Sequence, residues 1–211
     1  MANVIIFGAR DFAELAHYYL THDSEHDVVA FTLTKDYIEA DTFKGLPVVP
    51  FEEVESIYSP EDYAMFLPMS GDQMNKLRAE YYIRAKAKKY SLISYISSKA
   101  TVLTKDIGDN CFILEDNTIQ PYVKIGNNVV MWSGNHIGHH SVIHDHVMFT
   151  SHVVLSGHCN VGAYSFFGVN ATIRDGITIA EESFIAMSAS ITKDTVPKGV
   201  YKGVYSELAG K

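Results

Sequence analysis

Cysteine is scarce in this sequence, which has only Cys111 and Cys159 among its 211 residues. Two cysteines cannot provide the disulfide framework of a small secreted domain. Both fall at the same position of a repeat described below. We therefore interpret them as buried thiols, rather than a disulfide or a metal pair, in a protein of the reducing cytoplasm.

Long apolar runs are also missing, since no stretch reaches the roughly 20 residues of a membrane span. The chain passes from Met1 directly into a strand-like segment, so we expect no secretory signal. Basic residues are outnumbered, with 17 Lys and Arg against 25 Asp and Glu and a net charge of −8. We therefore expect no membrane or nucleic-acid partner. The densest basic stretch, Lys76 to Lys89, is interpreted as a solvated helix face.

A six-residue repeat is the strongest positive signal. Every sixth residue is large and apolar from Ile107 onward, at Ile107, Ile113, Ile119, Ile125, Met131, Ile137, Ile143, Phe149, Leu155, Val161, Phe167, Ile173, Ile179, Ile185 and Ile191. Four positions after most of these anchors stands a small or β-branched residue: Cys111, Val123, Val129, Ser141, Val147, Val153, Cys159, Ser165, Ala171, Ser183, Ala189 and Thr195. Helices repeat at about 3.6 residues and strands at 2, so neither explains this period. Short strands stacked into the coils of a parallel β-helix do explain it.

The repeat also predicts a register. With three hexads per coil, residues 18 apart lie one strand spacing, about 4.8 Å, above one another, and 15 hexads make five coils. A periodic core alone is compatible with a structural rod. Any function must therefore come from the residues on the outer surface of the repeat.

The first hundred residues alternate between strand and helix patterns. We expect strands at 4–7, 28–33, 46–49, 63–67 and 92–96, and helices after Phe12, at 52–57 and at 74–89. This alternation predicts a small Rossmann-like parallel sheet. The predicted fold is an α/β amino domain (1–97), an all-β parallel β-helix (98–196) and a tail (197–211).

The turn after the first strand carries Gly8-Ala9-Arg10 and opens a helix. Such turns bind phosphate groups through backbone N–H groups and the helix dipole. A dinucleotide fingerprint is incomplete, because Arg10 and Ala13 replace glycines and Asp11 adds negative charge. We predict a pocket for a nucleotide-linked or other small substrate between this turn and Ser70-Gly71. The alternative is a docking domain with an empty crevice.

Seven of the ten histidines cluster in one part of the repeat, at His136, His139, His140, His144, His146, His152 and His158. None occupies an anchor or inward position, so we expect them on the wall or at its corners. The register stacks His140 with His158 and His139 with Gly157. Glycine leaves room for a ligand beside the His139 imidazole, which exchanges protons near neutral pH.

The segment Ile137-Gly138-His139-His140-Ser141-Val142-Ile143, the start Ile5-Ile6-Phe7-Gly8-Ala9 and the hexads resemble one family in both halves of the chain. It comprises the sugar acetyltransferases of the left-handed β-helix superfamily related to sialic acid O-acetyltransferases and bacterial nucleotide-aminosugar N-acetyltransferases. In that family the first motif histidine takes the proton of an acceptor that attacks acetyl-CoA. The resemblance therefore assigns the general base to His139.

One position departs from the family pattern, in which an acidic residue follows and orients the base. Here that residue is His140, our second catalytic candidate, although an imidazole cannot stabilise an imidazolium as a carboxylate does. Asp145 or a group from a neighbouring subunit is the alternative. Asn135 and His136 are expected to contact the acceptor. The other four histidines of the cluster are interpreted as exposed or interface residues.

The resemblance also implies a groove for acetyl-CoA and no metal. An oxyanion on the thioester would be stabilised by the Gly157 N–H. The family tail Gly-x-Pro-Ala is replaced by Gly203-Val204-Tyr205-Ser206, which lacks the proline. The positions matching the backbone groups that hold the pantetheine arm are Gly157, Gly168, Val169, Ala186 and Met187.

The predicted activity is direct acetyl transfer, with no covalent enzyme intermediate, from acetyl-CoA to the amine of a nucleotide-linked sugar in surface-glycan or lipopolysaccharide synthesis. A sugar hydroxyl is the alternative acceptor. A carbonic-anhydrase-like zinc site on His139 and His144 is disfavoured, because Leu103 stands where its upstream ligand is needed. A non-catalytic trimeric scaffold is the non-enzymatic alternative. The resemblance implies a homotrimer with active sites completed between subunits.

Overall fold

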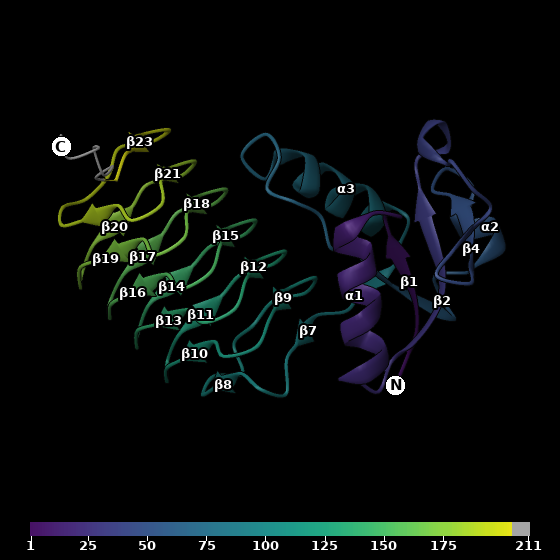
Figure 1. Cartoon of the computed structure of the whole chain (residues 1–211), viewed down its shortest axis with the longest axis horizontal. Coiled ribbons are helices and arrows are strands. Elements are labelled where there is room, and N and C mark those ends of the chain that lie inside the picture. Colours follow the sequence, from purple (N-terminus) through teal and green to yellow (C-terminus); the bar gives the residue numbers. More distant parts are fainter. Residues whose placement is uncertain (204–211) are drawn as a thin grey trace, which may run out of the picture.

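The computed structural model describes residues 1–203, so Val204, Tyr205 and Ser206 of the expected tail lie outside the described residues. An α/β part is followed by a solenoid that carries the chain away from it (Figure 1). The helices of the first part are α1 (Asp11–His22), the 3-10 turn η1 (Lys35–Tyr37), α2 (Val54–Ile57) and α3 (Lys76–Ala87). Its strands are β1 (Asn3–Phe7), β2 (Asp27–Leu33), β3 (Thr42–Phe43), β4 (Leu46–Pro50), β5 (Tyr63–Phe66) and β6 (Ser91–Leu92).

These strands form one sheet in the order β3-β4-β2-β1-β5-β6, in which only the β3–β4 pair is antiparallel. The expected strands and helices are confirmed to within a few residues, with one exception. The segment expected as a single strand at 92–96 is divided between β6 and a strand of the solenoid. Ser94 lies at the division, where its Oγ donates to the Gly108 carbonyl at 2.9 Å and accepts from the Cys111 N–H.

The solenoid has three walls of short parallel strands. The first wall contains β7 (Tyr95–Ile96), β9 (Phe112–Ile113), β12 (Val130–Met131), β15 (Met148–Phe149), β18 (Phe166–Phe167), β21 (Phe184–Ile185) and β23 (Val200–Tyr201). The second contains β8 (Thr101–Val102), β10 (Thr118–Ile119), β13 (His136–Ile137), β16 (Val154–Leu155), β19 (Thr172–Ile173) and β22 (Ser190–Ile191). The third contains β11 (Lys124–Ile125), β14 (Val142–Ile143), β17 (Asn160–Val161) and β20 (Thr178–Ile179).

The predicted register is confirmed, because residues 18 apart pair across neighbouring coils, as His136 does with Val154. All 15 anchors lie in the solenoid core or pack against it, and the smaller inward residues are buried beside them. Cys111 and Cys159 are free, buried thiols, as expected. The division at residues 98 and 196 stays a prediction. β7 lies before the first limit and β23 lies after the second, yet both strands pair within the first wall of the solenoid.

The chain turns between walls through residues with positive φ. At these corners stand His140, His146, His152 and His158, with φ of 58°, 65°, 59° and 57°. This left-handed conformation is uncommon for residues other than glycine and asparagine. The corners are called here 1–2, 2–3 and 3–1, after the walls that they join in chain order. Their position at the corners explains why these four histidines lie outside the hydrophobic core of the solenoid.

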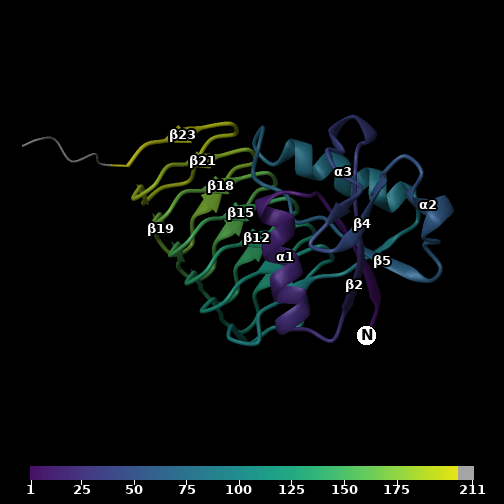
Figure 2. The same cartoon turned by 45° about the vertical axis from the view of Figure 1, so that its right-hand side comes forward.

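The outer face of the first wall is a second apolar surface. Phe112, Val130 and Met148 point outward from it and are buried against α1 residues such as Ala16 and Leu20 in one hydrophobic cluster. Figure 2, like Figure 1, shows α1 on the solenoid side of the parallel sheet. Burial of side chains of this size contributes about 1.5–3 kcal/mol each, so the two parts stabilise each other.

Arg78 corrects the interpretation of 76–89 as a solvated helix face. Its side chain is fully buried where α3 meets corner 3–1. The guanidinium donates to the carbonyls of Asn128 and His146 and to Asn75 Oδ1, the last two at 3.1 Å. Burial lowers the pKa of Arg78 to about 9, which still leaves it charged at neutral pH. This helix therefore anchors the first part to the solenoid.

His146, expected as an exposed or interface residue, lies in the same contact and is buried. Its Nδ1 is 2.9 Å from Asn128 Nδ2, and its ring packs on Tyr164. Burial, together with the nearby charge of Arg78, lowers the pKa of His146 to about 4. A protonated imidazole is therefore unfavourable in the folded protein.

A pH-dependent loss of stability is expected from His146. Its pKa is about 4 in the folded state against an ordinary value of 6.5, so the unfolded chain binds more protons between these values. The free energy of unfolding therefore falls as the pH drops from about 6.5 to 4. His146→Asn, which suits the φ of 65°, should weaken that dependence in chemical unfolding measured at several pH values. An unchanged pH dependence in the variant would contradict the assignment.

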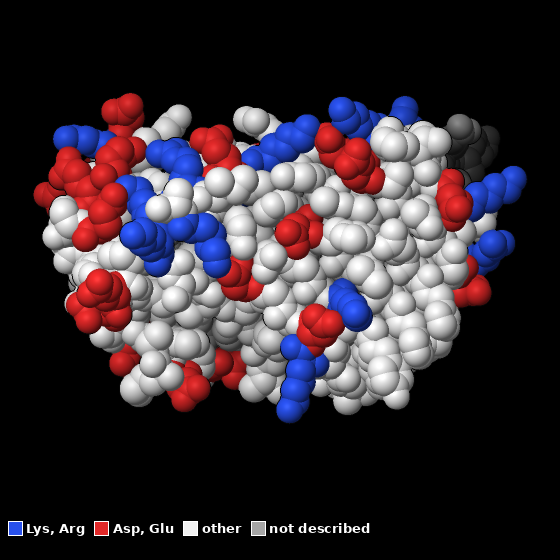
Figure 3. All heavy atoms as spheres, turned by 180° about the vertical axis from the view of Figure 1, so that it is seen from behind, with Lys and Arg blue, Asp and Glu red and all other residues white. Residues whose placement is uncertain are grey.

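Charged side chains are unevenly distributed. Seen from behind, Lys, Arg, Asp and Glu crowd the α/β part, whereas one broad face of the solenoid shows few of them (Figure 3). Within residues 1–203, none of the helices combines the length and apolar character needed to cross a bilayer.

Candidate functional site

Three exposed histidines gather at corner 2–3, between β13 and β14 and on the coil above. The His140 and His158 rings stack as predicted, with centroids 4.9 Å apart and an interplanar angle of 13°. Tyr122, one coil below His140, extends the stack at 4.6 Å. Tyr122 was not among the predicted site residues. It lies 18 residues before His140, and the same spacing predicted the stacking of His140 on His158.

His139 stands beside this stack. Its Nδ1 lies 3.0 Å from His140 Nδ1, and its backbone N–H donates to Gln120 Oε1 at 2.9 Å. In the contact between the two Nδ1 atoms, one nitrogen must carry the proton and donate it, and the other must accept. If His139 donates it, Nε2 of His139 keeps a free lone pair and can accept a proton from a substrate.

Gly157 lies against the His139 ring, as the register predicted. A Cβ built on Gly157 would be 2.9 Å from Cε1 and 3.0 Å from Nε2 of His139. The space that the missing side chain leaves is therefore used by the imidazole itself. Among the hydrogen bonds of residues 1–203, the Gly157 N–H has no acceptor.

Gly157→Ala is expected to keep the fold but to lower the rate of the acetyl transfer that the sequence predicts. The added methyl group meets a movable ring rather than backbone, so His139 must shift. A displacement of about 1 Å in a catalytic group can cost about 10²-fold in rate. The rate should be measured together with the melting temperature. A folded variant with the wild-type rate would show that the position of this ring is unimportant.

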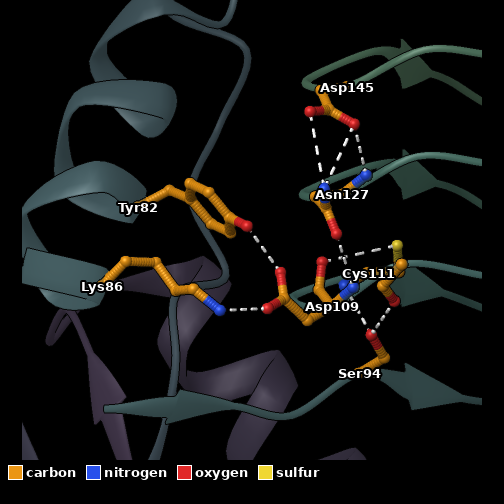
Figure 4. Close-up of polar contacts among 8 residues, drawn as sticks. Tyr82, Lys86, Ser94, Asp109, Cys111, Asn127 and Asp145 are labelled. Atoms are coloured by element: carbon orange, nitrogen blue, oxygen red, sulfur yellow. Dashed lines mark hydrogen bonds and ion pairs between the residues drawn. The ribbon is translucent and has the colours of Figure 1, made fainter. Parts of the chain in front are cut away.

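Asp145 does not orient His139. Its carboxylate lies at corner 3–1, where Oδ1 accepts from the Asn127 backbone N–H at 2.7 Å (Figure 4). Two coils below, Asp109 accepts from the Tyr82 hydroxyl at 2.7 Å and pairs with Lys86 at 2.6 Å, both on α3. Asp109 therefore belongs to the contact between α3 and the solenoid, whereas Asp145 bonds within the solenoid.

The expectation that Asn135 contacts the acceptor substrate also needs correction. It is buried at an inward position of the solenoid. Its amide donates to Asn117 Oδ1 at 2.9 Å and to the Trp132 carbonyl, and its oxygen accepts from the Val153 N–H. These bonds occupy the side chain within the wall. His136 points outward from β13 and is partly exposed.

The pocket predicted in the first part is present, with a volume of about 670 Å³. Gly8, Ala9, Arg10 and Ser70 line it, together with residues of the α1 amino end, Tyr37 and Tyr81. Gly71 does not line it, because the place of its Cβ is occupied by the Met148 sulfur at 2.8 Å. Gly71 is thus needed for packing on the solenoid. Small-ligand sites commonly have volumes of several hundred cubic ångströms, so a sugar nucleotide fits in size.

The residues expected to hold acetyl-CoA lie at two corners. Gly157 is at corner 2–3, whereas Gly168, Val169, Ala186 and Met187 are at corner 1–2 after β18 and β21. Gly168 permits close stacking there, since a Cβ would clash with the Met187 backbone nitrogen. Val169 and Met187 are 39% and 60% exposed and can contact a ligand. Neither His139 nor this corner lines the pocket of the first part, so the three places are separate within one chain.

Comparison with known proteins relates the fold to acyltransferases. No family model matches the chain. The acetyltransferase domain of PglB from Neisseria gonorrhoeae is 20% identical, with a TM-score of 0.81 over 97% of this chain and 100% of that one. A mutant of perosamine N-acetyltransferase from Caulobacter crescentus, in complex with CoA and GDP-perosamine, is 20% identical, with a TM-score of 0.81 over 100% and 98%. The resemblance to acetyltransferases is thus confirmed at the level of the fold.

Curated relatives match a shorter region. An acyl-[acyl-carrier-protein]–UDP-N-acetylglucosamine O-acyltransferase from Sinorhizobium fredii is 23% identical over 122 residues, which is 54% of this chain and 45% of that protein. The corresponding protein of Stutzerimonas stutzeri is 30% identical over 95 residues, 42% of this chain and 37% of that protein. The chain therefore spans less than half the length of these relatives.

Proposed function

We propose that the chain transfers an acetyl group from acetyl-CoA to the amine of a nucleotide-linked sugar, with His139 as the general base. The observation that carries this proposal is the 3.0 Å contact between His139 and His140 on an exposed corner beside Gly157. Two similar structures, one in complex with acetyl-CoA and the other with CoA and GDP-perosamine, support the choice of donor and acceptor class.

The reaction is direct. The acceptor nitrogen attacks the thioester carbonyl and gives its proton to Nε2 of His139, while His140 accepts from Nδ1 and fixes the tautomer. The unpaired N–H of Gly157 is suited to donate to the oxyanion of the tetrahedral intermediate. Collapse of the intermediate breaks the C–S bond, and the protonated His139 returns the proton to the CoA sulfur.

We assign the acceptor nucleotide to the pocket of the Rossmann-like amino domain and the pantetheine arm to corner 1–2 of the left-handed solenoid. Because these places are apart within one chain, the proposal includes a homotrimer in which neighbours complete each site. Thermal stability with and without acetyl-CoA, and sedimentation of the free protein, are the direct checks of donor binding and of assembly.

A panel of acceptors tests the activity. UDP-, dTDP- and GDP-linked amino sugars and matching hydroxyl sugars are incubated with acetyl-CoA, and release of CoA thiol is followed. We expect release with an amino sugar and much less with its hydroxyl counterpart. The curated relatives, named as O-acyltransferases, favour the hydroxyl as second candidate. Success with hydroxyl sugars alone would select it, and failure with every acceptor would contradict acetyl transfer.

Narrowing the pocket is expected to weaken acceptor binding selectively. Ala9 lines the pocket, so Ala9→Leu should raise KM for the sugar nucleotide by roughly tenfold or more through steric exclusion. KM for acetyl-CoA should not change. Ala40→Leu, at an exposed position outside the pocket lining, is the matched control. Equal effects on both substrates would argue against this location of the acceptor.

A further inference from the structure

Three imidazoles converge at corner 2–3 in an arrangement that proton transfer alone does not require. His139, His140 and His158 are all exposed, and one ring nitrogen of each lies within 4.8 Å of the others. His139 meets both neighbours edge to face, with centroids 5.2 Å from His140 and 5.0 Å from His158. In the part of the chain that the structure describes, the hydrogen bond of these rings is the one between His139 and His140, and no carboxylate takes part.

Three neutral imidazoles are a common ligand set for zinc and similar divalent ions. Zinc–nitrogen bonds of about 2.0–2.1 Å in a tetrahedral site place the ligand nitrogens about 3.4 Å apart. The nitrogens here, at most 4.8 Å apart, would have to close by about 1.4 Å. Exposed side chains can rotate by that amount without repacking a core.

The corner also has room for a fourth ligand. Gly176 stands one coil above His158, and no atom lies within 4 Å of the place where its Cβ would be. Three protein ligands with one open position can be completed by water or substrate. The net charge of −8 favours cations around the molecule.

We infer that His139, His140 and His158 bind a divalent transition-metal ion of the Zn²⁺ type, and that this ion inhibits acetyl transfer. The inhibition rests on the proposed function, because a metal bound to His139 removes a ring lone pair and fixes the ring. Binding does not rest on it. Metal-bound histidines usually donate their other N–H to a carboxylate or carbonyl. These rings have no such carboxylate among the described residues, so the ion binds reversibly and is an inhibitor, not a resident cofactor.

His158→Asn separates metal binding from the base. Asparagine suits the φ of 57° at this corner, where alanine would be strained. The matched control is His22→Asn, which replaces an exposed histidine in the last turn of α1, outside the solenoid and outside the pocket lining. Both variants lose one imidazole and keep His139 and His140.

The test uses the full chain with any affinity tag removed. Zn²⁺ binding is measured by calorimetry, and Co²⁺ binding by its visible absorption. We expect one ion per chain, affinity at least tenfold weaker in His158→Asn, and wild-type affinity in His22→Asn. Zn²⁺ should also lower the transfer rate, as a fraction of each protein's own metal-free rate, less in His158→Asn, and a chelator should restore it.

Two results would overturn the inference: no binding at one ion per chain, or binding that His158→Asn leaves unchanged. Binding at this site with a transfer rate that zinc does not affect would overturn the inhibitory role. If no acceptor supports transfer at all, the proposed function fails, while the calorimetry still decides whether the metal site exists.

Discussion

His139→Ala is expected to lower kcat by about 10²–10⁴-fold, the usual contribution of a positioned general base. Acetyl-CoA affinity should be retained, because the imidazole acts on the acceptor and the donor contacts are assigned to backbone groups. The ring is exposed and its bonds are to one neighbouring ring, so its loss should not affect folding. Steady-state kinetics and calorimetry with acetyl-CoA provide the two measurements.

The matched control is His22→Asn, an exposed histidine in the last turn of α1, outside the solenoid. Its rate should stay near that of the wild type. If His139→Ala retained near-normal turnover, the assignment of His139 as the base would be wrong.

Arg78→Ala should destabilise the protein by about 3–5 kcal/mol, because it leaves buried acceptors unsatisfied, at about 1–3 kcal/mol each, and opens a cavity. The side chain is fully buried and donates to carbonyls on two coils, which would lose their donor. Arg78→Met fills the volume without the hydrogen bonds and should recover part of the loss. The free energy of unfolding from denaturant titration gives both values.

Arg174→Ala, at an exposed position of the solenoid, controls for the loss of an arginine and should stay within about 0.5 kcal/mol of the wild type. Should Arg78→Ala prove as stable as this control, α3 would not be anchored through Arg78. The same helix carries Tyr82 and Lys86, whose contacts with Asp109 would then have to hold it.

The sequence predicts the solenoid well because its core is set by a local period. From Ile107 to Ile191, the burial of each anchor follows from its own position in the six-residue repeat. The stacking of one coil on the next follows from the same repeat. That register also placed His139 against Gly157 and His140 under His158. These contacts lie within two adjacent coils, so no knowledge of distant packing was needed.

The contacts between the two parts were not predictable in this way. Arg78 has the sequence context of a solvated helix face, yet it is buried, because α3 packs on a corner formed by residues much later in the chain. Gly71 and Asn135 resemble ligand-contacting residues in sequence, but each is used for packing within the molecule. The residue pattern of one helix or coil does not predict which distant part of the chain packs against it.

The most direct test of the central claim, direct transfer with His139 as base, is a rapid-quench experiment with acetyl-CoA labelled in its acetyl group. Wild-type protein and an amino sugar nucleotide should give labelled amide in the first turnover with no label on the protein, and His139→Ala should form that product at least about 10²-fold more slowly. Label accumulating on the protein, or equal rates for both proteins, would contradict the account.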